Sequence, residues 1–249
     1  HKQKPQREDF ELPMGAWLRF LGLYMAEGTM LREKHKTSYK IQIAAFKERE
    51  RSFAMETFAA LGLSPSENLP DRFTFSNKRI FVELERLGLL GVHAPQKFVP
   101  DFVFQQSAND IKQFLLGHFM GDGCEDNGGV RAHYTSSKQL AADLQRLIFL
   151  SGAESGLSSR GPRTATMLDG RTVTGNYPEY RVSVREQRNT SIVRKDVITV
   201  VQYDGEVFCA EVPTHHTLVT RRNGQILISG NCTANAGAEA MGFVYAVQT

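Results

Sequence analysis

The sequence predicts an α+β fold with two half-domains in a pseudo-two-fold repeat, followed by a short all-β segment. An apolar helix that ends in an acid and a glycine occurs twice, at Gly15–Gly28 and Asp110–Gly123. The acids, Glu27 and Asp122, are 95 positions apart, an interval too long for a solenoid repeat and typical of a duplicated half-domain. From Val197 onward, β-branched residues replace the helical periodicity.

Each half-domain is expected to run helix, two strands, helix, two strands, helix. Both first helices are mostly apolar on more than one face, and the glycine after each acid is expected to adopt the left-handed conformation that ends many helices. The remaining first-half elements are strands at 37–46 and 72–76 and helices at 51–63 and 78–87. The second half is expected to contain strands at 129–136, 155–160 and 177–185 and a helix at 138–150.

The segment that begins at Val197 is predicted to be β-structure. Val197–Asn231 is punctuated by Asp-Gly and Asn-Gly pairs, which are typical of hairpin turns. Thirty-odd residues form too few strands for an independent fold, so we expect partner strands elsewhere.

Composition indicates a globular protein. The chain has 41% hydrophobic and 23% charged residues, no apolar run of about 18 or more residues and no basic-then-apolar leader. We therefore expect a soluble, cytoplasmic monomer without a membrane partner. Cys124, Cys209 and Cys232 show no disulfide or zinc spacing, and we expect Cys124 to be a packing residue.

Basic residues concentrate in one segment. The net charge is +3, but Arg160–Lys195 holds eight basic residues against three acidic ones. Such a segment suits a phosphate backbone, and it equally suits a solvated loop and strand face.

Glu27 and Asp122 end their helices where the helix dipole favours a cation instead. Small residues just before them (Gly22 and Ala26 in one helix, Gly117 and Gly121 in the other) would let the two helices pack closely and bring both acids together. Two adjacent carboxylates favour a hard divalent cation such as Mg²⁺, which could activate water against a phosphodiester.

The two helix motifs, "FLGLYMAEG" and "LLGHFMGDG", resemble the paired motifs of LAGLIDADG (DOD-type) homing endonucleases. "QKFVPDFVF" between them is similar to the family's Lys-x-x-Pro block, and "YTSSKQLAADLQRLIFLSG" is similar to its helix block after the second motif. The resemblance covers roughly residues 15–192. It implies two β saddles that lie in the DNA major groove and metal-dependent, sequence-specific hydrolysis of both strands.

The resemblance also implies residue roles. Glu27 and Asp122 would hold Mg²⁺ as catalytic metal ligands, and Lys97 would act electrostatically or position water; taken alone, Lys97 reads as a solvated loop lysine. The basic residues of the saddles would contact phosphates or bases. They are Lys40, Lys47, Arg131, Arg181 and Arg185.

"VFCAEVPTHHTLVTRRNGQILISGNC" resembles the carboxyl-terminal blocks of an intein, part of a Hint splicing domain. The resemblance implies that the Asn231 side chain cyclises and cleaves the chain after itself, while the Cys232 thiol accepts the upstream segment. His216, whose neighbour is His215, would assist as the block histidine. Gly230 departs from the usual penultimate histidine.

Cys209 departs from the commonest intein pattern, which has Asp at that position. It resembles class 3 inteins, in which this cysteine initiates splicing, and Ser229 would stand where they carry Thr. A buried packing thiol is the alternative for Cys209.

These resemblances divide the chain as follows: 1–14, a linker from a missing amino-terminal splicing region; 15–105 and 106–196, the two LAGLIDADG half-domains; 197–231, the Hint segment; and 232–249, the start of the carboxyl extein. The expected partners are double-stranded DNA at an intein-less host-gene site and the missing amino-terminal intein segment, without which autocatalytic splicing is not expected. Two alternatives remain, namely a catalytically inactive LAGLIDADG nucleic-acid binder (maturase-like or decayed) and a purely autoprocessing element.

Overall fold

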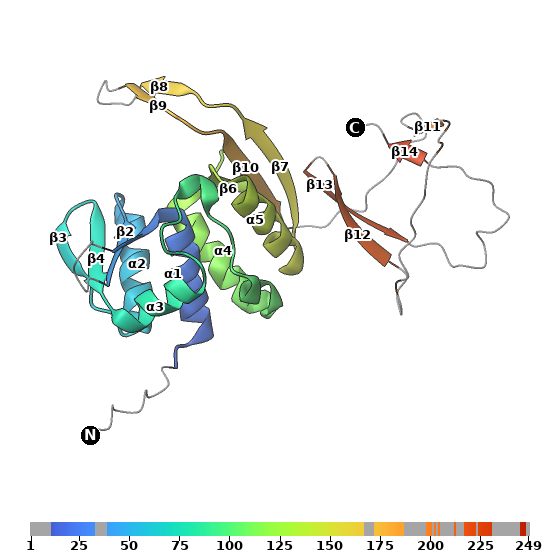
Figure 1. Cartoon of the computed structure of the whole chain (residues 1–249). Coiled ribbons are helices and arrows are strands. Elements are labelled where there is room, and N and C mark those ends of the chain that lie inside the picture. Colours follow the sequence, from blue (N-terminus) through green and yellow to red (C-terminus); the bar gives the residue numbers. More distant parts are fainter. Residues whose placement is uncertain are drawn as a thin grey trace. The chain divides into compact units, whose positions relative to one another are not determined.

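A computed structural model describes residues 11–32, 39–166, 172–186, 198–200, 202, 204, 212, 217–222, 224–230 and 245–247. The chain forms two compact units, His1–Gln187 and Arg188–Thr249. The first unit holds all the helices of the described residues and is a mixed α/β structure with antiparallel sheets (Figure 1). None of those helices is long and apolar enough to cross a membrane.

The first half of this unit (residues 14–86) contains α1 (Met14–Glu27), β1 (Gly28–Leu31), β2 (Lys40–Ala44), α2 (Glu48–Ala60), β3 (Ser66–Leu69), β4 (Arg72–Ser76) and α3 (Lys78–Arg86). Two short 3-10 helices follow, η1 (Ala94–Gln96) and η2 (Asp101–Gln105). The four strands form one antiparallel sheet in the order β1-β2-β4-β3, here called the first sheet.

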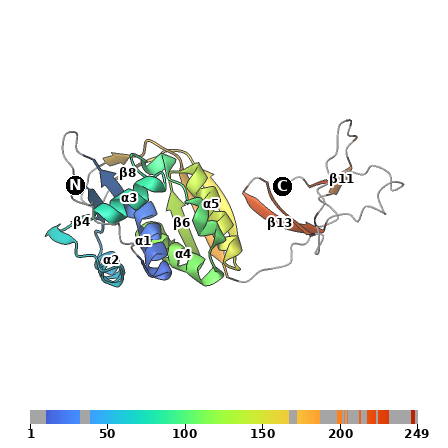
Figure 2. The ribbon, with the colours of Figure 1, turned by 60° about the horizontal axis from the view of Figure 1, so that its bottom comes forward.

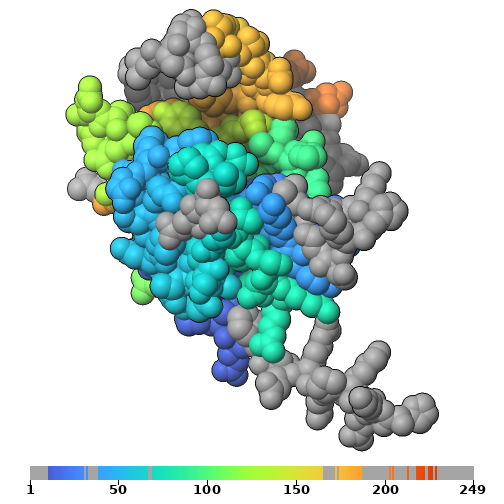
Figure 3. All heavy atoms as spheres, turned by 90° about the vertical axis from the view of Figure 1, so that its left-hand side faces the viewer, coloured from blue at the N-terminus to red at the C-terminus, as the bar shows by residue number. Residues whose placement is uncertain are grey.

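The second half (residues 108–185) contains α4 (Ala108–Asp122), β5 (Gly123–Glu125), β6 (Arg131–Thr135), α5 (Lys138–Leu150), β7 (Glu154–Arg160), β8 (Thr164–Thr166), β9 (Thr172–Thr174) and β10 (Glu179–Arg185). The second sheet has the order β5-β6-β10-β7, and β8 pairs with β9 as a separate hairpin. Seen from the side of the first half, the β8–β9 region stands as a yellow-orange ridge above it (Figure 3).

Side-chain alternation gives each sheet one buried and one open face. In the first sheet, Ile41, Ile43, Phe73 and Phe75 point into the core, while Lys40, Gln42 and Thr74 lie on the other face. Val182 is the fully buried residue of β10, so its neighbours Arg181 and Ser183 lie on the open face. Aromatic rings fill the first-half core, where Phe20 packs against Trp17, Phe58 and Phe75.

The predicted elements are largely confirmed, with differences at their ends. The helix predicted at 138–150 is α5 with the same bounds, whereas the helix predicted at 51–63 is α2, three residues earlier at both ends. Gly62 has a positive φ of 64° after α2, and this turn ends the helix. The structure adds β1, β3, β5 and the β8–β9 hairpin, which the sequence did not predict.

Two expectations about single residues were wrong. Gly28 and Gly123 are extended, with φ of −84° and −108°, so neither supplies a left-handed turn. Neither position has room for a side chain. A Cβ at Gly28 would lie 2.2 Å from Tyr24 Cδ2, and a Cβ at Gly123 would lie 2.2 Å from Phe119 O. Cys124 is exposed on β5 and is not a packing residue.

The second unit is described as strands only, in agreement with the predicted β-structure. β12 (Thr217–Arg222) and β13 (Gln225–Gly230) form a hairpin, and Gly224 between them has a φ of 76°. β11 (Ile198–Val200) pairs with β14 (Tyr245–Val247), which lies in the segment interpreted as an extein.

Candidate functional site

The site is built on the contact between α1 and α4, which lie side by side in both ribbon views (Figures 1 and 2). Two glycines make this contact possible. A Cβ at Gly22 would lie 2.0 Å from the carbonyl oxygen of Phe114, and a Cβ at Gly117 would lie 2.1 Å from that of Arg19. The helix backbones therefore touch, as the small residues predicted.

The close approach continues to the ends of both helices. A Cβ at Gly121 would lie 2.6 Å from Ala26 Cβ and 2.8 Å from Glu27 Cγ. Glu27 is the last residue of α1 and Asp122 the last of α4, so the structure brings the two acids together at one end of the helix pair.

The environment of these acids disfavours their charged forms. Burial raises the pKa of Asp122 to about 7, and the nearby Glu27 carboxylate adds to this rise. Burial and the Glu50 carboxylate raise the pKa of Glu27, while Lys97 and Lys47 act in the opposite direction. The pair is therefore poised to gain from a bound cation.

Lys97 is buried beside the acids, with 7% of its surface exposed, and is not a solvated loop lysine. Its Nζ donates to the carbonyl oxygens of Ala26 (3.0 Å) and Tyr24 (3.3 Å) at the end of α1. Burial lowers the pKa of Lys97 to about 8, although Asp122 and Glu27 favour its charged form. Ser137, at the start of α5, fixes the lysine backbone by donating to its carbonyl at 2.6 Å.

Glu50 is a site residue that sequence reasoning missed. Only 5% of its surface is exposed, and its carboxylate accepts from the Lys47 Nζ at 2.8 Å and from the Lys47 backbone N–H at 3.1 Å. Its position in the first turn of α2 matches a helix-capping pattern, which could have placed it. Lys47, predicted as a saddle residue, is the N-cap of α2 and not part of a strand, and it lies near the two acids.

The acids suit a hard divalent cation. Carboxylate oxygens are the preferred ligands of Mg²⁺, which usually keeps several waters and takes one or two protein carboxylates. No group of three or more His, Cys, Asp or Glu residues that could hold a metal occurs within the part of the chain that the structure describes. An ion here would be held by Glu27 and Asp122, with its remaining positions left to water and substrate oxygens.

The centre of the first sheet's open face is polar and uncharged, and Lys40 and Arg72 lie at its opposite ends. Thr29, Gln42 and Thr74 lie opposite one another across β1, β2 and β4, and Gln42 donates to Thr74 Oγ1 at 3.3 Å. Lys40 lies at one end of this face and lines a hollow of about 340 Å³ with Ser66 and Ser76.

The open face of the second sheet carries arginines. Arg181 and Arg185 lie on it, Arg181 half-buried and Arg185 exposed. Arg131 does not, because it shares a face with the buried His133 and lines a cavity on the helix side of the sheet. There it pairs with Glu125 (3.1 Å) and Glu186 (3.6 Å). Because Arg131 faces the helices, its position does not support the predicted contact with DNA on the open face of the sheet.

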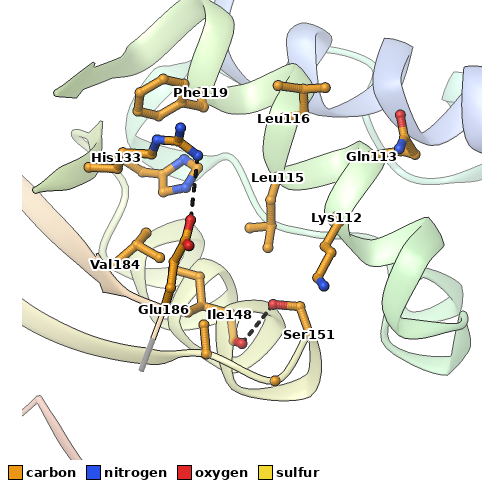
Figure 4. A pocket seen from close by; sticks show the side chains of 13 residues that line it. Lys112, Gln113, Leu115, Leu116, Phe119, His133, Ile148, Ser151, Val184 and Glu186 are labelled. Atoms are coloured by element: carbon orange, nitrogen blue, oxygen red, sulfur yellow. Dashed lines mark hydrogen bonds and ion pairs between the residues drawn. The ribbon is translucent and has the colours of Figure 1, made fainter. Parts of the chain in front are cut away.

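The cavity beside Arg131 has a volume of about 510 Å³ and lies between α4, the end of α5 and the second sheet (Figure 4). Leu115, Ile148 and Val184 supply its apolar lining, and His133 lies in its wall. The Nδ1 of His133 is 3.2 Å from the Nδ1 of fully buried His118, whose Nε2 has no hydrogen-bond partner among the described residues.

The predicted splicing residues Cys209, His216, Asn231 and Cys232, and His215 beside them, lie outside the described residues. Gly230 and Ser229 belong to β13, where they pair with Thr217 and Leu218 of β12.

No protein-family model matches the chain. Three curated proteins are similar to it. They are the "DNA-directed RNA polymerase subunit beta C-terminal section" of Stigeoclonium helveticum (23% identity over 88% of this chain), the "ATP-dependent Clp protease proteolytic subunit" of Chlamydomonas moewusii (29% over 57%) and the "Replicative DNA helicase DnaB" of Synechocystis sp. (30% over 58%). The similar region spans only 24%, 15% and 16% of these proteins, respectively.

Among solved structures, the chain is similar to the homing endonuclease I-DmoI in complex with DNA and Mn, with a TM-score of 0.44 and 12% identity over 69% of this chain and 89% of that one. It is also similar to full-length DUF199/WhiA from Thermatoga maritima, with a TM-score of 0.42 and 12% identity over 73% and 54%. The amino-terminal domain of WhiA is described as a LAGLIDADG domain.

Proposed function

We propose that this chain is an intein-borne LAGLIDADG homing endonuclease that makes metal-dependent, sequence-specific double-strand breaks in DNA. The observation that carries the nuclease part is the meeting of Glu27 and Asp122 at the ends of two helices in backbone contact, with Lys97 buried beside them. Both acids end apolar helices against the helix dipole, and a catalytic metal site accounts for this placement.

In this proposal Glu27 and Asp122 hold a divalent ion, and the open faces of the two sheets bind the DNA. When bound, Mg²⁺ would stabilise the charge that develops on the phosphate oxygens during hydrolysis. The Lys97 ammonium, fixed by two carbonyl oxygens, limits repulsion between the acids and keeps a positive charge near the scissile phosphate. The paired helices set the separation of the two acids and hence the spacing of the two cuts.

We further propose that the two halves are duplicated half-domains. The matching strand orders β1-β2-β4-β3 and β5-β6-β10-β7 support this, as does the same register after each acid, in which Gly28 pairs with Ile43 and Gly123 with His133. A duplicated binder would present two related saddles to the two halves of one DNA site.

Cleavage of a selected DNA tests the nuclease proposal. Duplexes with a randomised centre would be enriched by binding to the full chain in EDTA, and the enriched duplex would be placed in a supercoiled plasmid. We expect linearisation with Mg²⁺ and none with EDTA, and loss of about 100-fold or more in rate for Glu27→Gln or Asp122→Asn. Glu48→Gln, which changes an exposed acid of α2, is the matched control and should cut like the parent.

Binding without cutting, in either Mg²⁺ or Mn²⁺, would contradict the nuclease and favour the inactive nucleic-acid binder. Cutting that survives both acid substitutions would place the catalytic site elsewhere in the chain.

Two observations support the intein part of the proposal: the Asn231-Cys232 pair within the resemblance to intein blocks, and the unrelated functions of the similar curated proteins. A polymerase subunit, a protease subunit and a helicase are each similar to this chain over at most 24% of their own length, as expected of an inserted element that is independent of host function. Cys232 would accept the upstream segment and Asn231 would cyclise, with His216 assisting and Cys209 as the candidate initiating thiol.

Mass spectrometry tests this part. With an amino-terminal splicing segment supplied in trans, we expect the parent to lose residues 232–249 and Asn231→Ala to keep them. An intact mass for the parent under these conditions would contradict the intein proposal and leave the nuclease proposal standing.

A further inference from the structure

Arg181 occupies the centre of the second sheet's open face. Its strand, β10, lies between β6 and β7, and Arg181 is directly opposite Tyr134 on one side and Ser158 on the other. Its side chain is 36% exposed, which is enough to meet a ligand but too little for free rotation.

The guanidinium group is held from two directions. Arg181 Nε donates to Tyr134 Oη at 3.3 Å, and Arg181 Nη2 lies 3.7 Å from Asp126 Oδ2. Asp126 is itself fixed, because its Oδ1 accepts from the backbone N–H groups of Gly128 and Val130, each at 3.0 Å. The direction of the guanidinium fork is therefore set before any ligand arrives, which lowers the entropic cost of binding.

The charges around Arg181 favour a neutral ligand. Asp126 lies beside Arg181. Arg181 also lines a hollow of about 270 Å³ together with Glu179 and with Arg160, which forms an ion pair with Glu179. Arg160 and Arg181 are balanced here by Glu179 and Asp126, so Arg181 attracts a phosphate less than an unpaired arginine would, whereas the O6 and N7 atoms of a guanine are uncharged acceptors that match the fork. Arg185 differs from Arg181. It is the exposed last residue of β10, lies on the same face of the sheet and has no ion pair with a described residue.

We propose that Arg181 reads one guanine in the major groove, through O6 and N7, whereas Arg185 contacts a phosphate. This inference rests on the proposed function, since it takes the second sheet's open face as a DNA-binding surface. In this inference, one side chain, Arg181, recognises guanine at one base pair of the DNA site. Tyr134 and Asp126 hold that side chain in place.

Selection from a library of randomised duplexes, in EDTA and with the full chain, tests this. We expect the parent to enrich a G·C pair at a fixed position. Arg181→Met should lose the preference at that position alone, by roughly 5- to 150-fold in discrimination against the other bases. Arg181→Lys, which keeps the charge but loses the fork, should lose it as well.

Arg185→Met is the matched control. It should weaken binding to all sequences alike, keep the enriched sequence and lower the slope of log affinity against log salt by about one, whereas Arg181→Met should leave the salt slope almost unchanged. Equal thermal unfolding midpoints for the three variants and the parent would confirm that folding is intact.

Two results would overturn the inference. If the Arg181→Met variant enriches the same sequence as the parent and binds all duplexes more weakly, Arg181 is a phosphate contact and the DNA-binding function stands. If the parent enriches no sequence at all, the proposed function and this inference fail together.

Discussion

The ammonium group of Lys97 interacts with both candidate catalytic acids, Glu27 and Asp122. A lysine with 7% exposure loses most of its hydration, and two carbonyl oxygens of α1 replace part of it. Its pKa of about 8 leaves the ammonium mostly charged at neutral pH, because Asp122 and Glu27 offset part of the cost of burial. Lys97 thereby offsets part of the repulsion between these two neighbouring carboxylates.

Glu50 contributes to the balance of positive and negative charges at the site. Three acids (Glu27, Glu50 and Asp122) and two lysines (Lys47 and Lys97) influence one another at the site, so that one negative charge remains when all are ionised. An excess of negative charge attracts a divalent cation, and the Lys47–Glu50 pair at 2.8 Å reduces that excess.

At the scale of elements, the contact between α1 and α4 depends on glycine. In Gly117→Ala the new Cβ would lie 2.1 Å from Arg19 O and 2.9 Å from Leu23 N, and backbone atoms cannot move aside without shifting a helix. We expect the free energy of unfolding to fall by more than about 2 kcal/mol, measured by the fluorescence of the chain's one tryptophan, Trp17, in the first-half core.

Gly15→Ala is the matched control on the same helix pair. Its Cβ would meet only the flexible side chain of Gln113, at 3.6 Å, and that of Asp110, at 3.9 Å. Because alanine favours a helix over glycine by about 1 kcal/mol, this variant should be as stable as the parent or more so. Equal losses in the two variants would show that helix packing is not what Gly117 provides.

The helices and their close contact could be predicted from the sequence, because apolar periodicity and the spacing of small residues are local patterns. β1 and β5 could not, since strands of 4 and 3 residues leave no readable alternation. The glycines after both acids were identified by position but for the wrong reason, because crowding by Tyr24 and Phe119 is a tertiary property. The face on which Arg131 lies depends on strand register, which the sequence did not reveal.

Within the first unit, positions at the same spacing from Gly28 and Gly123 carry different side chains. Leu23 and His118 are each five residues before the glycine that follows an acid, and Ile43 and His133 pair with those glycines. Apolar side chains in the first half thus correspond to a buried histidine pair in the second. Phe20 similarly corresponds to Leu115, which lines the 510 Å³ cavity. The second half is therefore the more polar at the two positions that its histidines occupy.

This asymmetry predicts acid sensitivity. Burial lowers the pKa of His118 well below its usual value and that of His133 to about 4. The unfolded chain binds these protons near pH 6.5 and the folded chain does not, so stability falls as pH drops from about 6.5 towards 4, by at most roughly 1.4 kcal/mol per pH unit for each histidine. Asp122, with its raised pKa, acts in the opposite direction, so only a comparison of variants isolates the histidines.

The double variant His118→Leu/His133→Ile introduces, at these two positions, the residue types of Leu23 and Ile43. We expect its urea unfolding free energy, followed by Trp17 fluorescence at pH 7, 6 and 5, to fall less with acid than that of the parent. His93→Gln, which changes an exposed histidine, should follow the parent at every pH. If the double variant instead shows the parent's full pH dependence, the buried histidine pair is not the source of the acid sensitivity.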